Sequence, residues 1–168
     1  ESPSNFLGMP VFYEDRIYVT SGGDIWWGKK EAWLHCIDAT QTGDITSTGK
    51  IWSHPLEEHS AATPAISNGL VYVTDCGKNL HCVNATNGRL YWRHSLDRDA
   101  WGSALVADGK VFTGSRGGDF WILKEGKTRD VLGHVKLDRP IHSTPAAANG
   151  TLFISTMNSL YAVSRYER

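Results

Sequence analysis

The sequence predicts an all-β protein built from repeated four-stranded antiparallel units, and three observations support this fold class. A pattern of about 40 residues recurs along the chain. Short segments rich in β-branched and aromatic residues alternate with turn signals that contain Asn and Gly. No stretch keeps the apolar period of three to four residues that is typical of an amphipathic helix.

Four segments define the repeat, and they align without a gap. They are PVFYEDRIYVT from Pro10, PAISNGLVYVT from Pro64, ALVADGKVFTG from Ala104 and PAAANGTLFIS from Pro145. Each carries an aromatic residue at its ninth position: Tyr18, Tyr72, Phe112 and Phe153. The first unit is longer than the others, so it contains an insertion.

The second unit shows the strands of one repeat most clearly. Its candidate strands cover residues 65–67, 70–74, 80–83 and 90–92, separated by Asn68-Gly69, residues 76–79 and Asn87-Gly88. Asn-Gly supplies the positive φ angles of a tight hairpin, so each unit is predicted to be an antiparallel meander. One such unit cannot bury both of its faces, so stacked units predict a β-propeller. We expect about four blades, at residues 8–58, 59–99, 100–140 and 141–168, with the last one incomplete.

Charge and hydropathy exclude two classes of function. The 168 residues contain 17 Lys and Arg against 18 Asp and Glu, a net charge of -1, with no basic run that would follow a phosphate backbone. No apolar stretch reaches the roughly 20 residues that span a bilayer. We therefore expect neither a nucleic-acid partner nor a membrane span.

The segment LHCVNATNGRLYW, which ends at Trp92, resembles the repeat of the pyrroloquinoline-quinone-type (PQQ-like) β-propellers. The pattern of that family is Ala-x-Asp-x-x-Thr-Gly-x-x-x-Trp, and its Ala, Gly and Trp dock one blade on the next. The resemblance implies docking roles for Cys36, Gly49 and Trp52 in the first unit, Cys82, Gly88 and Trp92 in the second, and Ala162 in the fourth. The third unit departs from the pattern, because Ile122 holds the Ala position and no Trp closes the unit.

Members of this family usually have seven or eight blades, so the resemblance implies a fragment, roughly the C-terminal half of a larger ring. The alternative is a closed ring of four blades. Bare blade faces at the two ends of an open arc would favour a protein partner or self-association.

The resemblance leaves two functions open. The first is a non-catalytic scaffold for interaction or assembly, located in the periplasm or outside the cell. The alternative is a fragment of a quinoprotein, a PQQ-dependent alcohol or sugar dehydrogenase. Such enzymes bind PQQ with calcium and commonly place adjacent cysteines against the cofactor. This sequence has no Cys-Cys pair. It also has no cluster of acidic residues that would suit calcium, because Asp97 and Asp99 are separated by Arg98. We therefore expect the scaffold, with no cofactor and no catalytic residue.

A candidate ligand site lies at the predicted mouth of the axial channel. Trp101 and His142 occupy equivalent positions before two innermost strands, and Arg98 and Arg139 are nearby. An aromatic face, an imidazole and cations together suit an anionic or aromatic ligand. The alternative is that these large side chains only plug the channel.

Two further features give expectations. Trp26 and Trp27, in the insertion of the first unit, are candidates for a partner anchor, although they could also pack on their own blade. Cys36 and Cys82 should fill a small apolar position. Each follows a histidine, His35 or His81, but adjacent residues of a strand point to opposite faces, so no metal site is expected from these His-Cys pairs. Cys76 lies in a predicted turn and is expected to be the exposed thiol.

Overall fold

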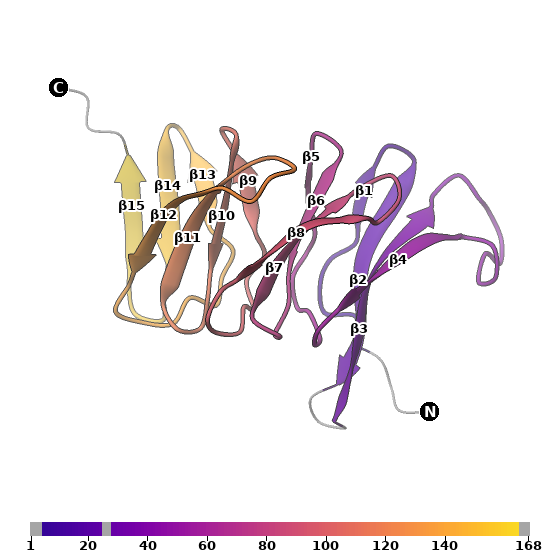
Figure 1. Cartoon of the computed structure of the whole chain (residues 1–168), viewed down its shortest axis with the longest axis horizontal. Helices are drawn as coiled ribbons and strands as arrows, with labels where there is room; N and C mark the ends of the chain where they lie inside the picture. Colours follow the sequence, from indigo (N-terminus) through magenta and orange to yellow (C-terminus); the bar gives the residue numbers. More distant parts are fainter. Residues whose placement is uncertain (1–4, 25–27, 165–168) are drawn as a thin grey trace.

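A computed structural model describes residues 5–24 and 28–164, and these residues form 15 β-strands in four antiparallel sheets (Figure 1). The prediction of an all-β fold built from antiparallel blades is therefore confirmed. Within the same residues, no helix has the length and apolar character needed to cross a membrane.

Each sheet takes its strands from one repeat unit, in chain order. The first sheet contains β1 (Val11–Tyr13), β2 (Arg16–Asp24), β3 (Lys29–Asp38) and β4 (Lys50–Leu56). The second contains β5 (Ala65–Ser67), β6 (Leu70–Thr74), β7 (Asn79–Asn84) and β8 (Leu90–Ser95). The third contains β9 (Leu105–Ala107), β10 (Lys110–Gly114), β11 (Asp119–Lys124) and β12 (Val131–Lys136). Within the described residues the fourth contains β13 (Ala146–Ala148), β14 (Thr151–Ser155) and β15 (Leu160–Ser164).

The first hairpin of each sheet closes through two residues with positive φ. Asn68 and Gly69 have φ angles of 49° and 71°. Asp108-Gly109 and Asn149-Gly150 repeat this conformation, and Glu14-Asp15 adopts it without a glycine. Because two successive left-handed residues match the twist of paired strands, these turns fix the register between the two innermost strands of each sheet.

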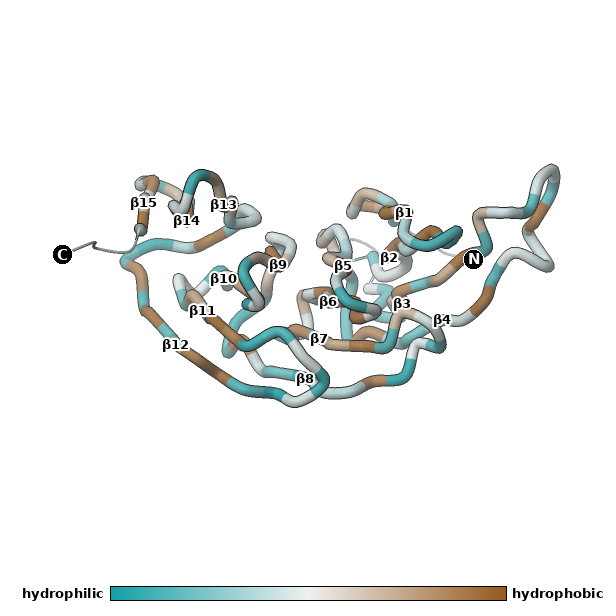
Figure 2. The backbone as a smooth tube through the Cα atoms, turned by 90° about the horizontal axis from the view of Figure 1, so that it is seen from above, coloured by the Kyte–Doolittle hydropathy of each residue, from teal (hydrophilic) through white to brown (hydrophobic). Residues whose placement is uncertain are grey.

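The sheets fan out as an open half ring (Figure 2). The short strands β1, β5, β9 and β13 line the concave side, and β4, β8 and β12 follow the convex outer side. The first and last sheets lie at opposite ends of the molecule in both views, so the described sheets do not close into a four-bladed ring.

The hydrophobic core lies between neighbouring sheets. At the first junction, Leu34 and Cys36 pack with Val71 and Val83 of the second sheet. The second junction is built in the same way from residues that include Tyr72, Cys82, Trp92, Val111 and Leu123. The third is smaller, and its buried members are Phe112, Phe120, Ile141 and Ile154.

Candidate functional site

The loops that precede the innermost strands are tied together by a repeated hydrogen bond. The backbone N–H of Met9 donates to Thr63 Oγ1 at 3.0 Å, and the N–H of Thr63 donates to Ser103 Oγ at 2.8 Å. The N–H of Ser103 donates in turn to Thr144 Oγ1 at 3.0 Å. These bonds join the equivalent loops of the four sheets in series, so residues far apart in the sequence become neighbours.

The side chain of Trp101 is the centre of the candidate site. His142, from the loop before β13, stacks on it with ring centroids 6.4 Å apart and planes inclined by 26°. His59, from the loop before β5, meets the indole edge-on at a centroid distance of 6.4 Å. Trp101 nevertheless remains 39% exposed. Three loops thus hold one aromatic ring at the surface.

An ion pair fixes the orientation of this indole. The Oδ2 atom of Asp99 accepts hydrogen bonds from Trp101 Nε1 at 3.0 Å and from Arg116 Nη1 at 2.9 Å. The guanidinium carbon of Arg116 lies 5.3 Å from the centroid of the indole, which is a cation–π distance. We call Trp101, His59, His142, Asp99 and Arg116 the Trp101 cluster.

The structure brings together only part of the set predicted from the sequence. Trp101 and His142 are in contact, as their equivalent positions suggested. Arg98 and Arg139 are exposed, and the cation over the indole is Arg116 instead. Trp26 and Trp27 lie outside the described residues.

Sequence reasoning missed His59, Asp99 and Arg116. Arg116 lies in the turn between β10 and β11, and its backbone N–H donates to the carbonyl oxygen of Asp99 at 2.9 Å. A similar bond joins the N–H of Cys76 to the carbonyl oxygen of His59. The aligned repeat could therefore have predicted that each such turn folds back on the loop before its sheet's innermost strand.

The Trp101 cluster combines an aromatic ring with a cation, and this combination suits an anionic or aromatic ligand. The residues do not fit PQQ with calcium, because calcium requires several oxygen ligands and Asp99 is already engaged by Arg116 and Trp101. Over residues 5–24 and 28–164, no group of three or more His, Cys, Asp or Glu side chains could hold a metal ion.

The indoles of Trp52 and Trp92 each cross to the next sheet. Trp52 Nε1 donates to the carbonyl oxygen of Ala85 at 3.1 Å, and Trp92 Nε1 donates to that of Gly126 at 2.9 Å. A Cβ atom on Gly88 would lie 2.6 Å from the Trp52 ring, so only glycine allows this close approach. Each indole thus places its apolar faces in a junction while satisfying its one polar atom.

The other residues with implied docking roles occupy different environments. Cys36 and Cys82 are fully buried in the first and second junctions. Gly49 is buried in the turn before β4, where its N–H donates to the carbonyl oxygen of Ile45 at 2.8 Å. Ala162 is exposed on β15 and docks on no sheet within the described residues, unlike the cysteines at the equivalent position.

The expectation of an exposed Cys76 thiol is wrong. Cys76 is 6% exposed, and its Sγ lies 3.7 Å from the carbonyl oxygen of Ala100, toward which it donates. Burial is the main cause that raises the pKa of this thiol to about 12, and the nearby Asp99 carboxylate adds to the effect. The thiol lies in a turn, as predicted, but the loop before β9 covers that turn.

A buried polar cluster crosses the first junction. His81 Nε2 lies 2.8 Å from Asp75 Oδ2, and its Nδ1 lies 3.3 Å from His54 Nε2 of the first sheet. Burial and the neighbouring His81 lower the pKa of His54 to about 4. At neutral pH His54 is therefore uncharged, and one of the two facing ring nitrogens, His54 Nε2 or His81 Nδ1, can donate a hydrogen bond to the other.

Together, the fold and the junctions define a class of protein: a β-propeller whose blades are joined by an indole that reaches the turn of the next blade. A family model described as outer membrane protein assembly factor BamB matches residues 30–131. This chain belongs to that family of PQQ-like repeat proteins.

Solved structures share the fold at low sequence identity. BamB from Moraxella catarrhalis is 12% identical with a TM-score of 0.67, over 92% of this chain and 41% of that one. The computationally designed Ika4 protein is 9% identical with a TM-score of 0.70, over 98% of this chain and 93% of that one. A europium-containing methanol dehydrogenase is 14% identical with a TM-score of 0.57, over 80% and 26%.

At these identities the likeness concerns the fold alone. This chain spans about two fifths of the length of the Moraxella protein, since it covers 41% of it. A search of curated proteins found no match.

Proposed function

We propose that this protein is a non-catalytic scaffold that binds a protein partner outside the cytoplasm, in the periplasm or the extracellular space. Its family is described as an outer membrane protein assembly factor, which supports both the role and the location. Function follows sites more closely than fold, so the proposal depends mainly on the Trp101 cluster.

The observation that carries the proposal is an exposed tryptophan held in a fixed orientation. Trp101 is 39% exposed although His59, His142, Asp99 and Arg116 all contact it. Tryptophan and arginine are enriched among the residues that dominate binding energy at protein interfaces. A side chain that is already oriented loses little conformational entropy when a partner covers it.

The chemistry of the cluster favours a partner segment with an aromatic or anionic side chain. The exposed part of the indole offers apolar surface, and the Arg116 side chain is 45% exposed beside it. His142, Arg98 and Arg139 are also exposed. Asp99 neutralises part of the charge of Arg116, so the interface should combine apolar burial with one charge-assisted contact.

Site-specific crosslinking tests this proposal. A photoreactive benzoylphenylalanine replaces His142 in one sample and, as the matched control, Leu90 in another; Leu90 is 42% exposed on the outer strand β8. We expect one discrete crosslinked partner from position 142 in cells that produce the protein, and none from position 90.

The partner found in this way then allows a binding measurement. Trp101→Ala should weaken its binding at least about tenfold, and Leu90→Ala should leave the affinity unchanged. Equal crosslinking from both positions, or unchanged affinity of Trp101→Ala, would overturn the proposed site.

The bare faces at the two ends of the arc support a second kind of contact, self-association. Leu160 on β15 is 69% exposed, and Trp33 on β3 is 40% exposed. Large apolar side chains exposed on a sheet face are candidates for burial against another protein surface. Light scattering at micromolar concentration should therefore give a mass above that of one chain, and a strictly monomeric sample would contradict this part of the proposal.

A further inference from the structure

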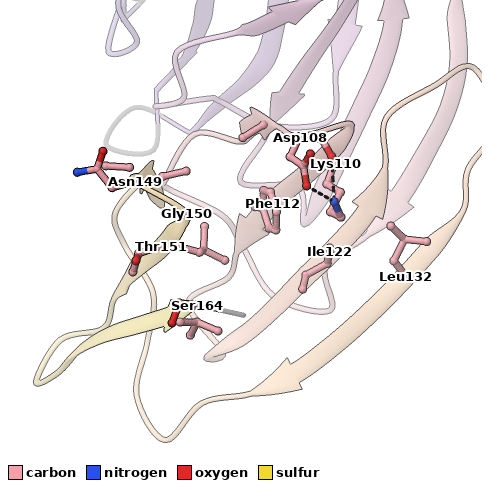
Figure 3. A pocket seen from close by; sticks show the side chains of 14 residues that line it. Asp108, Lys110, Phe112, Ile122, Leu132, Asn149, Gly150, Thr151 and Ser164 are labelled. Carbon is pink, nitrogen blue, oxygen red and sulfur yellow. Dashed lines mark hydrogen bonds and ion pairs between the residues drawn. The ribbon is translucent and has the colours of Figure 1, made fainter. Parts of the chain in front are cut away.

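A groove of about 940 Å³ lies between the third and fourth sheets. Figure 3 shows Phe112, Ile122 and Leu132 of the third sheet around the groove, which the fourth sheet bounds on its other side. Leu152 and Val163 line that other side. The volume falls within the range of about 300–1,000 Å³ that is typical of binding sites for small organic groups.

The groove occupies the position that an indole fills in the two other junctions. Trp52 and Trp92 each pair across strands with the cysteine of the preceding strand, and both side chains point toward the next sheet. In the third sheet, the residue that pairs with Ile122 in the same register is Gly133. The third junction therefore has a glycine where the others have a tryptophan.

The walls of the groove also correspond to the walls around those indoles. Tyr18 and Tyr72 flank Trp52 and Trp92, with ring centroids 5.8 and 5.9 Å apart. Phe112, which lines the groove, is the aromatic residue at the same position of the third repeat.

The opposite wall repeats as well. Val71 and Val83 of the second sheet belong to the core against which Trp52 packs. Leu152 and Val163 are an equivalent cross-strand pair of the fourth sheet, and they line the groove.

We propose that this groove binds the tryptophan side chain of a partner polypeptide, which supplies the indole that the third repeat lacks. The inference deepens the proposed scaffold function and rests on it. Tryptophan is favoured over a purely apolar side chain because an indole fills the equivalent position in the two other junctions, and because the Ser164 hydroxyl, which lines the groove, can accept a hydrogen bond from its ring N–H. The groove exceeds one indole in volume, which leaves space for the neighbouring residues of the partner.

The test uses N-acetyl-tryptophanamide as the probe and the whole 168-residue chain as the protein. Titration followed by methyl NMR should produce saturable shifts at Ile122, Leu132, Leu152 and Val163, with a dissociation constant on the order of 1 mM for a ligand of this size. N-acetyl-leucinamide, the apolar control probe, should bind at least about fivefold more weakly because it has neither a ring nor a ring N–H.

Two variants at position 133 distinguish a loss of probe binding caused by filling the groove from one caused by damage to the sheet. A Cβ atom on Gly133 would lie 3.7 Å from Ile122 Cδ1, an ordinary contact, so both variants fit the backbone. Gly133→Trp should fill the groove and weaken probe binding at least about tenfold. Gly133→Ala should leave binding unchanged, because a methyl group occupies little of the space.

Non-saturable shifts in the unmodified protein, equal binding of the two probes, or undiminished binding by Gly133→Trp would each overturn the proposal. The NMR measurement on the unmodified chain is decisive even if a variant does not fold. Failure of the probe together with partner crosslinking at position 142 would reject the groove alone. Saturable probe binding without that crosslink would reject the Trp101 site alone.

Discussion

The second and third junctions of this protein have the same strand register but different contents. In the second, Trp92 is 7% exposed, its Nε1 donates to the carbonyl oxygen of Gly126, and Tyr72 Oη accepts the N–H of Gly126 at 2.9 Å. In the third, Gly133 takes the place of the indole, and the adjacent Leu132 is 51% exposed. One side chain per repeat therefore decides whether a junction is packed or open.

The largest expected effect follows from removing the indole of the packed junction. Trp92→Ala should lower the free energy of unfolding by about 3 to 5 kcal/mol, because it leaves a cavity and removes the hydrogen bond from the indole to the Gly126 carbonyl oxygen. Urea melts measure this change, with Leu90→Ala on the same strand as the exposed control. A loss below about 1 kcal/mol would show that the indole contributes little to the second junction.

Thiol accessibility compares the two junctions directly. Cys82 is fully buried and burial raises its pKa to about 12, so a maleimide should modify it only slowly in the native state. Ile122→Cys places a thiol at the same position of the open junction, where labelling should be at least about a hundredfold faster.

Cys36 and Cys76 should resemble Cys82, since both are buried and both pKa values are raised, chiefly by burial. Mass spectrometry after timed labelling gives the rates. Similar rates for Cys82 and for the introduced thiol would remove the distinction between the junctions.

Acid should weaken the first junction through His54. The pKa of His54 is lowered from 6.5 to about 4, so the unfolded chain takes up a proton at a higher pH than the folded one does. The stabilisation is complete above pH 6.5 and is lost as the pH falls toward 4. We expect a loss of about 3 kcal/mol over this range in urea melts. His54→Gln should reduce the dependence of the free energy of unfolding on pH. An unchanged dependence in that variant would contradict the assignment of the acid effect to His54.

The smallest expected effect comes from closing the open junction. Gly133→Trp should raise the free energy of unfolding by about 1 kcal/mol, since it adds apolar burial and removes a glycine from a strand. Thermal melts compare it with Gly133→Ala, which also removes the glycine from the strand but does not add the burial of an indole. If the two variants were equally stable, the introduced indole would not be packed against the fourth sheet.

The sequence predicts the strands well where turn chemistry and alternation agree. The second unit was expected at 65–67, 70–74, 80–83 and 90–92, and β5 to β8 cover these segments with small extensions at β7 and β8. The candidate site was harder to predict. Arg116 reaches Trp101 because a hairpin returns to the loop before its own sheet, and Cys76 is buried because another loop covers it. Both outcomes depend on packing between segments, which local patterns do not encode.

The hydrogen bonds between the inner loops also have a consequence for how such a chain can change in length. Thr63 and Ser103 each act twice, since each backbone N–H donates to the following repeat and each hydroxyl accepts from the preceding one. A repeat with both groups is interchangeable with any other internal repeat, so duplication or deletion of one unit leaves no donor or acceptor unmatched there. Met9 can donate but has no hydroxyl to accept, which makes the first repeat the one unit here that could not be moved to an internal position without breaking the series.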